Sequence, residues 1–369
     1  MTEYFKKYTS NCIAGCANQH YFETDGECVM TSRAYFKIAH GGEYDYSLLF
    51  SGILDGNFRR ISYANEPCDG WTIHSASVGR CRDIPRGELC DLKMDSDIIT
   101  EWLAELTFDG ERKKTVAAEL FYSDPVRLSF DAGEYLALEI TYSGGKIPCH
   151  PECMIPIYRK TADGWAYDVE MPLPSMIGCT REVRERIAFL GDSITQGCGS
   201  GFNEYKHWNA RLSEMIGGER AFWNLGIGYG TATSAASDGV WLGKAKQNDT
   251  VFVCYGVNDI NSLHTADEVI SDISAIIEKL RLAKCKIILQ TVPPFDYPPE
   301  KKAVWCEVNE RIKNELSRKV DFTFDCVPLL SVDGARSEIT RYGGHPNAEG
   351  CAVWAEALWR AVKPLFEVK

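Results

Sequence analysis

The stretch Ala188-Phe-Leu-Gly-Asp-Ser-Ile-Thr-Gln-Gly197 decides how the second half of this chain folds. Its apolar residues run into Gly191, so the pattern predicts a buried strand that ends in a glycine turn. In a parallel sheet this turn would carry Ser193 to the carboxyl edge, where ligands bind in open α/β proteins. A serine at that edge can act as a nucleophile if a base and an oxyanion site lie within reach.

Alternating strands and helices surround this stretch from about residue 184 onward. Strands are expected at residues 187–190, 221–224, 251–255, 287–290 and 322–325. Helices are expected to connect them, including one that begins with the capping box Thr265-Ala-Asp-Glu268 and others over residues 300–318 and 348–362. This alternation predicts a parallel sheet with right-handed crossovers.

The first half of the chain has a different pattern, made of short β-strands. Strands are expected at residues 34–40, 46–50, 72–78, 102–108, 126–130, 135–141 and 155–158, whereas residues 1–30 predict only an arm or a first strand. Turn signals such as Asp109-Gly110 and Gly144-Gly145 separate them, which favours an all-β sandwich or jelly roll. We therefore expect a β-sandwich (jelly-roll-like) domain over residues 1–180 and an α/β domain over residues 181–369.

Composition restricts the partners and the cellular location. The net charge of −12 argues against nucleic acid or an anionic membrane surface as a partner. No apolar run approaches the roughly 18 residues of a membrane-spanning helix. The N-terminus has no apolar segment typical of an export signal, so a cytoplasmic protein is expected. The oligomeric state stays open.

The cysteines are numerous but do not suggest a metal site. There are 15, an odd number, and several lie in apolar runs, so reduced and buried thiols are expected. The pairs Cys12/Cys16 and Cys149/Cys153 lack the Cys-x-x-Cys spacing of common zinc sites. We expect neither a metal nor an organic cofactor.

Three further blocks follow the Gly-Asp-Ser turn. They are Asn224-Leu-Gly-Ile-Gly-Tyr-Gly230, Tyr255-Gly-Val-Asn-Asp259 and Gly344-His-Pro-Asn347. In this order and spacing, the four blocks resemble the SGNH (GDSL-type) esterase family over roughly residues 185–365. The resemblance implies a flavodoxin-like, three-layer α/β/α hydrolase domain and a serine esterase that needs no cofactor.

The resemblance also implies a role for each block. The candidate site residues are Ser193, His345, Gly228, Gly230 and Asn258. Ser193 would attack the acyl carbonyl, and His345 would take its proton, because an imidazole with a pKa of about 6.5 accepts and returns protons near neutral pH. The N–H groups of Ser193 and of the segment Gly228–Gly230, together with the Asn258 amide, would hold the oxyanion. Asp259 is free to cap the helix that follows it.

Two positions depart from the family pattern. The family usually places an aspartate three residues before the histidine, where this chain has Tyr342, and a glycine where this chain has Tyr229. A main-chain oxyanion donor does not require glycine. Some SGNH carbohydrate esterases with an N-terminal β-sandwich are Ser–His dyad enzymes, so a dyad is expected here. Asp333 and Glu338 are the alternative acids.

The substrate expectation rests on the resemblance to that two-domain subgroup. The segment Ser123-Asp-Pro-Val126 is similar to part of the β-sandwich in those esterases, which implies O-deacetylation of an acetylated mono- or oligosaccharide. The alternatives are a lipid-type esterase or thioesterase, and a carbohydrate-binding protein with a catalytically weak domain. The aromatic candidates for sugar binding are Trp208, Tyr229, Phe295, Tyr297 and Trp305, and core packing is the alternative for each.

Overall fold

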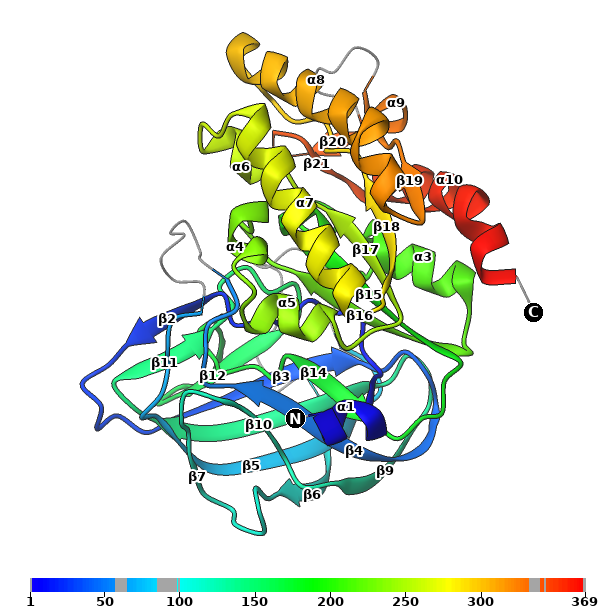
Figure 1. Ribbon diagram of the computed structural model, residues 1–369. Coiled ribbons are helices and arrows are strands. Elements are labelled where there is room, and N and C mark those ends of the chain that lie inside the picture. The colour runs from blue at the N-terminus through cyan, green and yellow to red at the C-terminus, as the bar shows by residue number, and fades with distance from the viewer. Residues whose placement is uncertain are drawn as a thin grey trace. The chain divides into compact units, whose positions relative to one another are not determined.

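The structure is a computed structural model that describes residues 2–56, 65–84, 98, 100–331, 339–341 and 343–367, with only the backbone described at residue 341 (Figure 1). The chain divides into two compact units. The first runs to Asp55, resumes up to Val183 and takes in Phe202–Glu204. The second contains Arg184–Gly201 and continues from Tyr205 toward the C-terminus.

The described part of the first unit is built mainly from antiparallel strands. They are β1 (Thr9–Ser10), β2 (His20–Glu23), β3 (Met30–Lys37), β4 (Gly42–Ser51), β5 (Thr72–Cys81), β6 (Glu101–Leu106), β7 (Lys114–Thr115), β8 (Leu120–Tyr122), β9 (Val126–Phe130), β10 (Tyr135–Ser143), β11 (Lys146–Cys149), β12 (Ile157–Thr161), β13 (Gly164–Tyr167) and β14 (Met176–Cys179). One sheet has the order β1-β14-β4-β8 with β9 also on β4, and a larger one has the order β13-β12-β3-β10-β5-β6 with β7 on β5. Strands β11 and β2 form a separate pair. The predicted β character is confirmed, and the jelly-roll connectivity stays a prediction.

Aromatic side chains fill the interior of this unit. Phe50 of β4 stacks on Phe121 of β8 with ring centroids 5.4 Å apart, and Phe108 lies 5.9 Å from Phe121. The N-terminal residues, expected to be an arm or a first strand, instead begin with the helix α1 (Thr2–Lys7), which buries Tyr4 and Phe5. A helix of 6 residues is too short to show a helical period in the sequence.

The second unit contains a five-stranded parallel sheet in the order β16-β15-β17-β18-β19. The strands are β15 (Glu185–Gly191), β16 (Arg220–Gly226), β17 (Thr250–Cys254), β18 (Lys286–Gln290) and β19 (Phe322–Phe324). All five lie where the sequence predicts them. In chain order the strands occupy positions 2-1-3-4-5, which is the flavodoxin-like order, and ligands of such sheets bind where the order reverses, next to the first strand. Here that place is the carboxyl end of β15.

Helices connect these strands. They are α2 (Ser193–Gln196), α3 (Trp208–Ile216), α4 (Ala232–Ala236), α5 (Val240–Ala245), α6 (Val257–Asn261), α7 (Ala266–Leu282), α8 (Pro299–Asn314), α9 (Val327–Leu330) and α10 (Ala348–Glu367), with a 3₁₀ helix at Leu316–Lys319 and a small pair of strands, β20 (Thr340–Arg341) and β21 (His345–Pro346). Helix α3 packs on α10, whereas α7 packs on α4 and α8 (Figure 1). The predicted capping box of α7 is present, with Thr265 and Glu268 bonded reciprocally.

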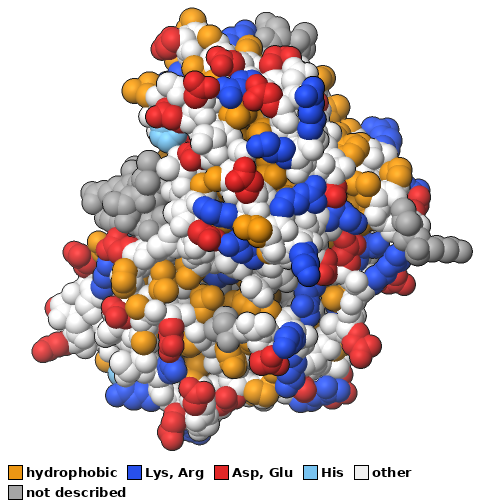
Figure 2. All heavy atoms as spheres, viewed as in Figure 1, with side chains coloured by type: hydrophobic (Ala, Val, Ile, Leu, Met, Phe, Trp, Pro, Cys, Tyr) orange, Lys and Arg blue, Asp and Glu red, His pale blue; other side chains and the backbone are white. Residues whose placement is uncertain are grey.

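Surface and cysteine chemistry agree with the composition. On the face that Figure 2 displays, acidic and basic side chains are intermingled. Every cysteine in the described part of the chain is free. None of the described helices has both the length and the apolar character needed to cross a membrane.

Candidate active site

The nucleophile candidate is presented by a tight turn at the end of β15. Asp192 has an extended backbone, and its carboxylate accepts a hydrogen bond from the N–H of Ile194 at 2.9 Å, so it caps the short helix α2. Ser193 is therefore the first residue of that helix and is partly exposed. A Cβ on Gly191 would lie 2.7 Å from the carbonyl oxygen of Cys254, which explains the glycine before the turn.

The base candidate, His345, lies far from Ser193 in the sequence but next to it in the fold. The Oγ of Ser193 lies 2.8 Å from Nε2 of His345, which belongs to β21. This is hydrogen-bond distance, so the imidazole can accept the hydroxyl proton directly. The structure thus brings together the two residues that the sequence predicted as nucleophile and base.

A neighbouring loop packs closely around the histidine. Gly344 has φ +126°, and a Cβ there would lie 2.7 Å from Cα of Phe295. The Phe295 ring meets the His345 ring at a centroid distance of 5.5 Å and an angle of 75°. The N–H of Asp296 donates to the carbonyl oxygen of Gly343 at 3.0 Å. The imidazole is therefore flanked by the Phe295 ring, and the loop that carries this ring is hydrogen-bonded to the turn before His345.

The alternative acids, Asp333 and Glu338, lie outside the residues that the structure describes, and so does Tyr342, which stands at the position of the family aspartate. The expectation of a Ser–His dyad consequently stays a prediction.

The glycine-rich turn differs from the sequence expectation. The N–H of Gly228 donates to Oε1 of Gln196 at 2.6 Å, and the N–H of Gly230 donates to the carbonyl oxygen of Ile227 at 2.9 Å. The two glycines predicted as oxyanion donors thus have their N–H groups engaged within the protein, because the turn closes on itself and on α2. Tyr229 between them has φ +57°, the left-handed conformation in which glycine is favoured.

Asn258 lies at the same edge of the sheet, beyond the end of β17. Its amide Nδ2 donates to the carbonyl oxygen of Gly230 at 2.9 Å, and the side chain is partly exposed. An amide nitrogen carries two hydrogens, so this bond leaves one for a ligand. The geometry is compatible with the predicted role of Asn258 as an oxyanion donor.

Asp259 caps a different helix from the one expected. Its side chain has no exposed surface, and its oxygens accept the N–H groups of Ala232 at 3.1 Å and Thr233 at 3.4 Å. These are the first residues of α4, whereas α6, which contains Asp259, has no side-chain cap. The capping expectation for the helix that follows Asp259 in the chain was wrong, because the unpaired N–H groups nearest to it belong to α4.

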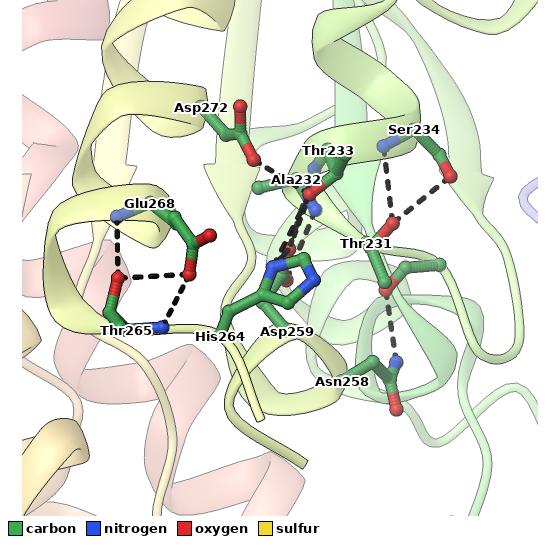
Figure 3. A network of polar contacts seen from close by, with 11 residues as sticks. Thr231, Ala232, Thr233, Ser234, Asn258, Asp259, His264, Thr265, Glu268 and Asp272 are labelled. Carbon is green, nitrogen blue, oxygen red and sulfur yellow. Dashed lines mark hydrogen bonds and ion pairs between the residues drawn. The ribbon is translucent and has the colours of Figure 1, made fainter. Parts of the chain in front are cut away.

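One group of residues in the described part of the chain has the spacing of a metal site. Ligand atoms of Asp259, His264 and Asp272 all lie within 4.8 Å of one another. The hydroxyl of Thr233 lies among them, at 2.6 Å from Asp272, 3.4 Å from His264 and 3.5 Å from Asp259 (Figure 3). A hydroxyl therefore occupies the centre of the group, where a cation would have to bind.

Two buried carboxyl groups lie at the base of the site. Burial raises the pKa of Asp192 to about 7, and the negative charge of Asp259 adds to the increase, whereas the N–H of Ile194 opposes it. Burial also raises the pKa of Asp259, against the effect of the two α4 N–H groups that it accepts. Both carboxyls hold helix starts rather than facing a substrate directly.

The aromatic candidates divide into two sets. Trp208 has no exposed surface and stacks on Trp354 at 5.1 Å, and Trp305 is 4% exposed, with Nε1 donating to the carbonyl oxygen of Val292. The prediction that these two tryptophans bind substrate was wrong, since no ring face is left to meet a sugar. Phe295, Tyr297 and Tyr229 are partly exposed and stay candidates.

Gln196 was missed by the sequence analysis. Beyond accepting from Gly228, it accepts a bond from the Asn224 amide through its main-chain oxygen at 3.2 Å, and it is 1% exposed. It therefore connects the nucleophile helix to the glycine-rich turn. Only its position inside the Gly-Asp-Ser block could have pointed to a role for Gln196. A single buried glutamine does not form a recognisable motif.

A comparison with protein families matches part of the second unit. Residues 189–353 match the model of the GDSL-like Lipase/Acylhydrolase family. The matched segment contains Ser193, Asn258 and His345. The match supports a GDSL-type hydrolase domain with acylhydrolase activity.

Solved structures give more distant likenesses. A member of the lipolytic protein G-D-S-L family from Veillonella parvula is 20% identical over 50% of this chain and 99% of its own, with a TM-score of 0.42. A carbohydrate esterase family 3 protein from Talaromyces cellulolyticus is 20% identical over 50% of this chain and 99% of its own, at 0.41. An active-site mutant of a family two carbohydrate esterase from Clostridium thermocellum is 14% identical and covers 97% of both chains, at 0.39. No curated protein matches the sequence significantly.

Proposed function

We propose that this protein is a serine esterase that works through an acyl-enzyme, with Ser193 as nucleophile and His345 as general base. The observation that carries the proposal is the 2.8 Å contact between Ser193 Oγ and His345 Nε2 at the carboxyl end of β15. Oγ attacks the ester carbonyl carbon while Nε2 takes its proton, and the imidazolium then returns that proton to the departing alcohol. A water molecule, deprotonated by the same imidazole, releases the acid and restores the serine.

Three donors would stabilise the oxyanion. They are the N–H of Ser193, the free hydrogen of the Asn258 amide and the N–H of Tyr229 in place of the two glycines first expected. Tyr229 has the left-handed backbone of the family's glycine position, and the N–H groups on either side of it are already bonded within the protein. Removing one such donor typically lowers kcat by about 10²–10³.

The proposed reaction is O-deacetylation of an acetylated mono- or oligosaccharide. The four motif blocks, the antiparallel β unit before them and the partly exposed Phe295 beside His345 support it. A lipid-type esterase or thioesterase is the second candidate. Acetyl esters should be hydrolysed much faster than long-chain acyl esters, whereas the second candidate predicts the reverse order.

The test is the Ser193→Ala variant, assayed with 4-nitrophenyl acetate and with a panel of acetylated oligosaccharides. Loss of a serine nucleophile lowers kcat by about 10⁶ in a well-studied case, so we expect no turnover above background. Ser271→Ala, an exposed serine on α7, is the matched control and should keep full activity. A folded Ser193→Ala protein that keeps more than about a thousandth of kcat would contradict the proposal.

A further inference from the structure

The turn that would present the Tyr229 N–H has an unfavourable backbone. Tyr229 has φ +57°, and a residue with a Cβ in this conformation costs roughly 1–2 kcal/mol relative to the right-handed region. A turn of this kind keeps its shape only where its surroundings hold it. The residues that hold the following segment therefore decide where the donor points.

Two consecutive residues of α6 hold that segment. Asn258 donates from Nδ2 to the carbonyl oxygen of Gly230 at 2.9 Å. Asp259 accepts the N–H groups of Ala232 at 3.1 Å and Thr233 at 3.4 Å. The oxyanion amide and the glycine-rich turn are thus fixed to each other through neighbouring side chains of one helix.

The chemistry at Asp259 requires a carboxylate. Its side chain is fully buried, and within the described residues no Lys or Arg pairs with it; His264 Nδ1 lies 3.8 Å away. A carboxylate only accepts hydrogen bonds, so both of its oxygens can receive N–H groups from α4. An asparagine would have the same shape but would turn an NH₂ group toward one of those donors.

Helix α7 contacts the same segment through the side chain of Thr233. The Thr233 hydroxyl donates to Asp272 at 2.6 Å and lies 3.4 Å from His264 Nδ1, and Figure 3 shows Thr233 between these two side chains. Thr233 is therefore held on its main-chain side by Asp259 and on its side-chain side by α7. The start of α4 is fixed from both directions.

We propose that Asp259 is a positioning residue for the esterase reaction, which holds the Tyr229 turn and the Asn258 amide in the geometry that binds the oxyanion. In this proposal Thr233 connects the segment held by Asp259 to α7 through its hydroxyl. The proposal rests on the proposed function. Oxyanion donors act more strongly on the transition state than on the bound ester, so loss of their alignment lowers kcat and leaves KM nearly unchanged.

The experiment is a double-mutant cycle between Asp259→Asn and Asn258→Ala with 4-nitrophenyl acetate. Rates are expressed per active site, counted with a serine-reactive organophosphorus reagent. Asp259→Asn should lower kcat about 10- to 100-fold with KM changed less than about threefold. In the Asn258→Ala background the same change should cost clearly less, because one of the two oxyanion donors that Asp259 positions is already gone.

A milder pair of variants covers the case in which Asp259→Asn does not fold. Thr233→Val removes the hydroxyl that links to α7 and should lower kcat about three- to tenfold, whereas Thr233→Ser keeps the hydroxyl and should restore it. The control is Asp267→Asn, also on α7, whose side chain is 88% exposed and pairs with Arg311. It should leave kcat unchanged.

Two outcomes would overturn the proposal. One is a cost of Asp259→Asn that is the same with and without Asn258, or that disappears when rates are expressed per active site. The other is Thr233→Val with wild-type kcat. Failure of the proposed function is separate, since it would appear as turnover by Ser193→Ala.

Discussion

The two halves of the active site are held in different ways. The nucleophile half, which comprises Ser193, Asn258 and the turn at residues 227–233, is fixed by buried hydrogen bonds. Among the described residues, the base half, which comprises His345 and the loops beside it, is packed closely at two glycines, Gly199 and Gly344. The difference shows which parts of the site can be read from a motif and which depend on distant segments of the chain.

In the nucleophile half, side chains of the motif blocks hold their own block or a segment next to another block. Asp192 caps the helix of Ser193, Gln196 accepts the N–H of Gly228, and Asp259 accepts two N–H groups of α4. All three are buried polar side chains with satisfied bonds, and losing one partner of such a bond costs about 1–3 kcal/mol. This half should resist displacement.

In the base half, the contacts around the histidine come from loops far away in the sequence. A Cβ on Gly199, which has φ +92°, would lie 2.9 Å from Cβ of His345, and one on Gly344 would meet Phe295. Packing of this kind leaves little room for a methyl group but is weakly directional. This half should therefore be the more sensitive to small steric changes.

The largest effect that we expect from this difference is that of Gly344→Ala. The added methyl group would meet Phe295 and would force a residue with a Cβ to adopt φ +126°. A shift of about 1 Å in the neighbouring imidazole can cost about 10² in rate, so kcat should fall roughly 10- to 100-fold. The measurement is kcat with 4-nitrophenyl acetate, together with thermal unfolding.

The matched control for Gly344→Ala is Gly243→Ala in α5. Its Cβ would meet nothing within 4 Å, and alanine favours a helix by up to about 1 kcal/mol over glycine. This variant should keep wild-type kcat. If Gly344→Ala also keeps it, close packing does not position the histidine.

A smaller effect is expected from the candidate acids of the base half. Asp333→Asn and Glu338→Gln should each change kcat by less than about tenfold, because we propose that the reaction runs as a Ser–His dyad. Removal of the acid from a true triad costs about 10⁴. A loss of that size in either variant, with the fold intact, would show that a displaced carboxylate completes a triad.

The smallest effect on kcat, less than about threefold, is expected from Asp192→Asn, because asparagine caps a helix as well as aspartate does. Its effect on stability should depend on pH. Burial raises the pKa of Asp192 to about 7 in the folded protein, against about 3.9 when unfolded. As pH rises, Asp192 therefore loses its proton in the unfolded state before it does so in the folded state. The unfolding free energy of the wild type accordingly falls between about pH 4 and about pH 7.

The variant lacks this titration. The unfolding free energy of the wild type, relative to Asp192→Asn, should therefore drop by up to about 4 kcal/mol over this pH range and stay constant above it. Denaturant unfolding of both proteins at several pH values measures the difference. A difference that does not change with pH would show that the carboxyl is ionised throughout.

The fold could be predicted where the pattern is local. The five strands of the parallel sheet are short apolar runs, and the capping box at Thr265 lies within four residues, so both were correct. The role of Asp259 could not be read, because the N–H groups that it accepts lie 27 and 26 residues earlier in the chain. Trp208 was misassigned for the same reason, since its partner Trp354 comes from the C-terminal helix.

The most direct measurement is to trap the acyl-enzyme. The wild-type protein is mixed with 4-nitrophenyl acetate, quenched in acid within the first turnovers and digested, and the acetylated peptide is sequenced by mass spectrometry. We predict one acetyl group, on Ser193, that is absent from Ser193→Ala and disappears from the wild type once the ester is consumed. An acetyl group on another residue, or hydrolysis at full rate without any acetyl on Ser193, would contradict the assignment of Ser193 as the nucleophile.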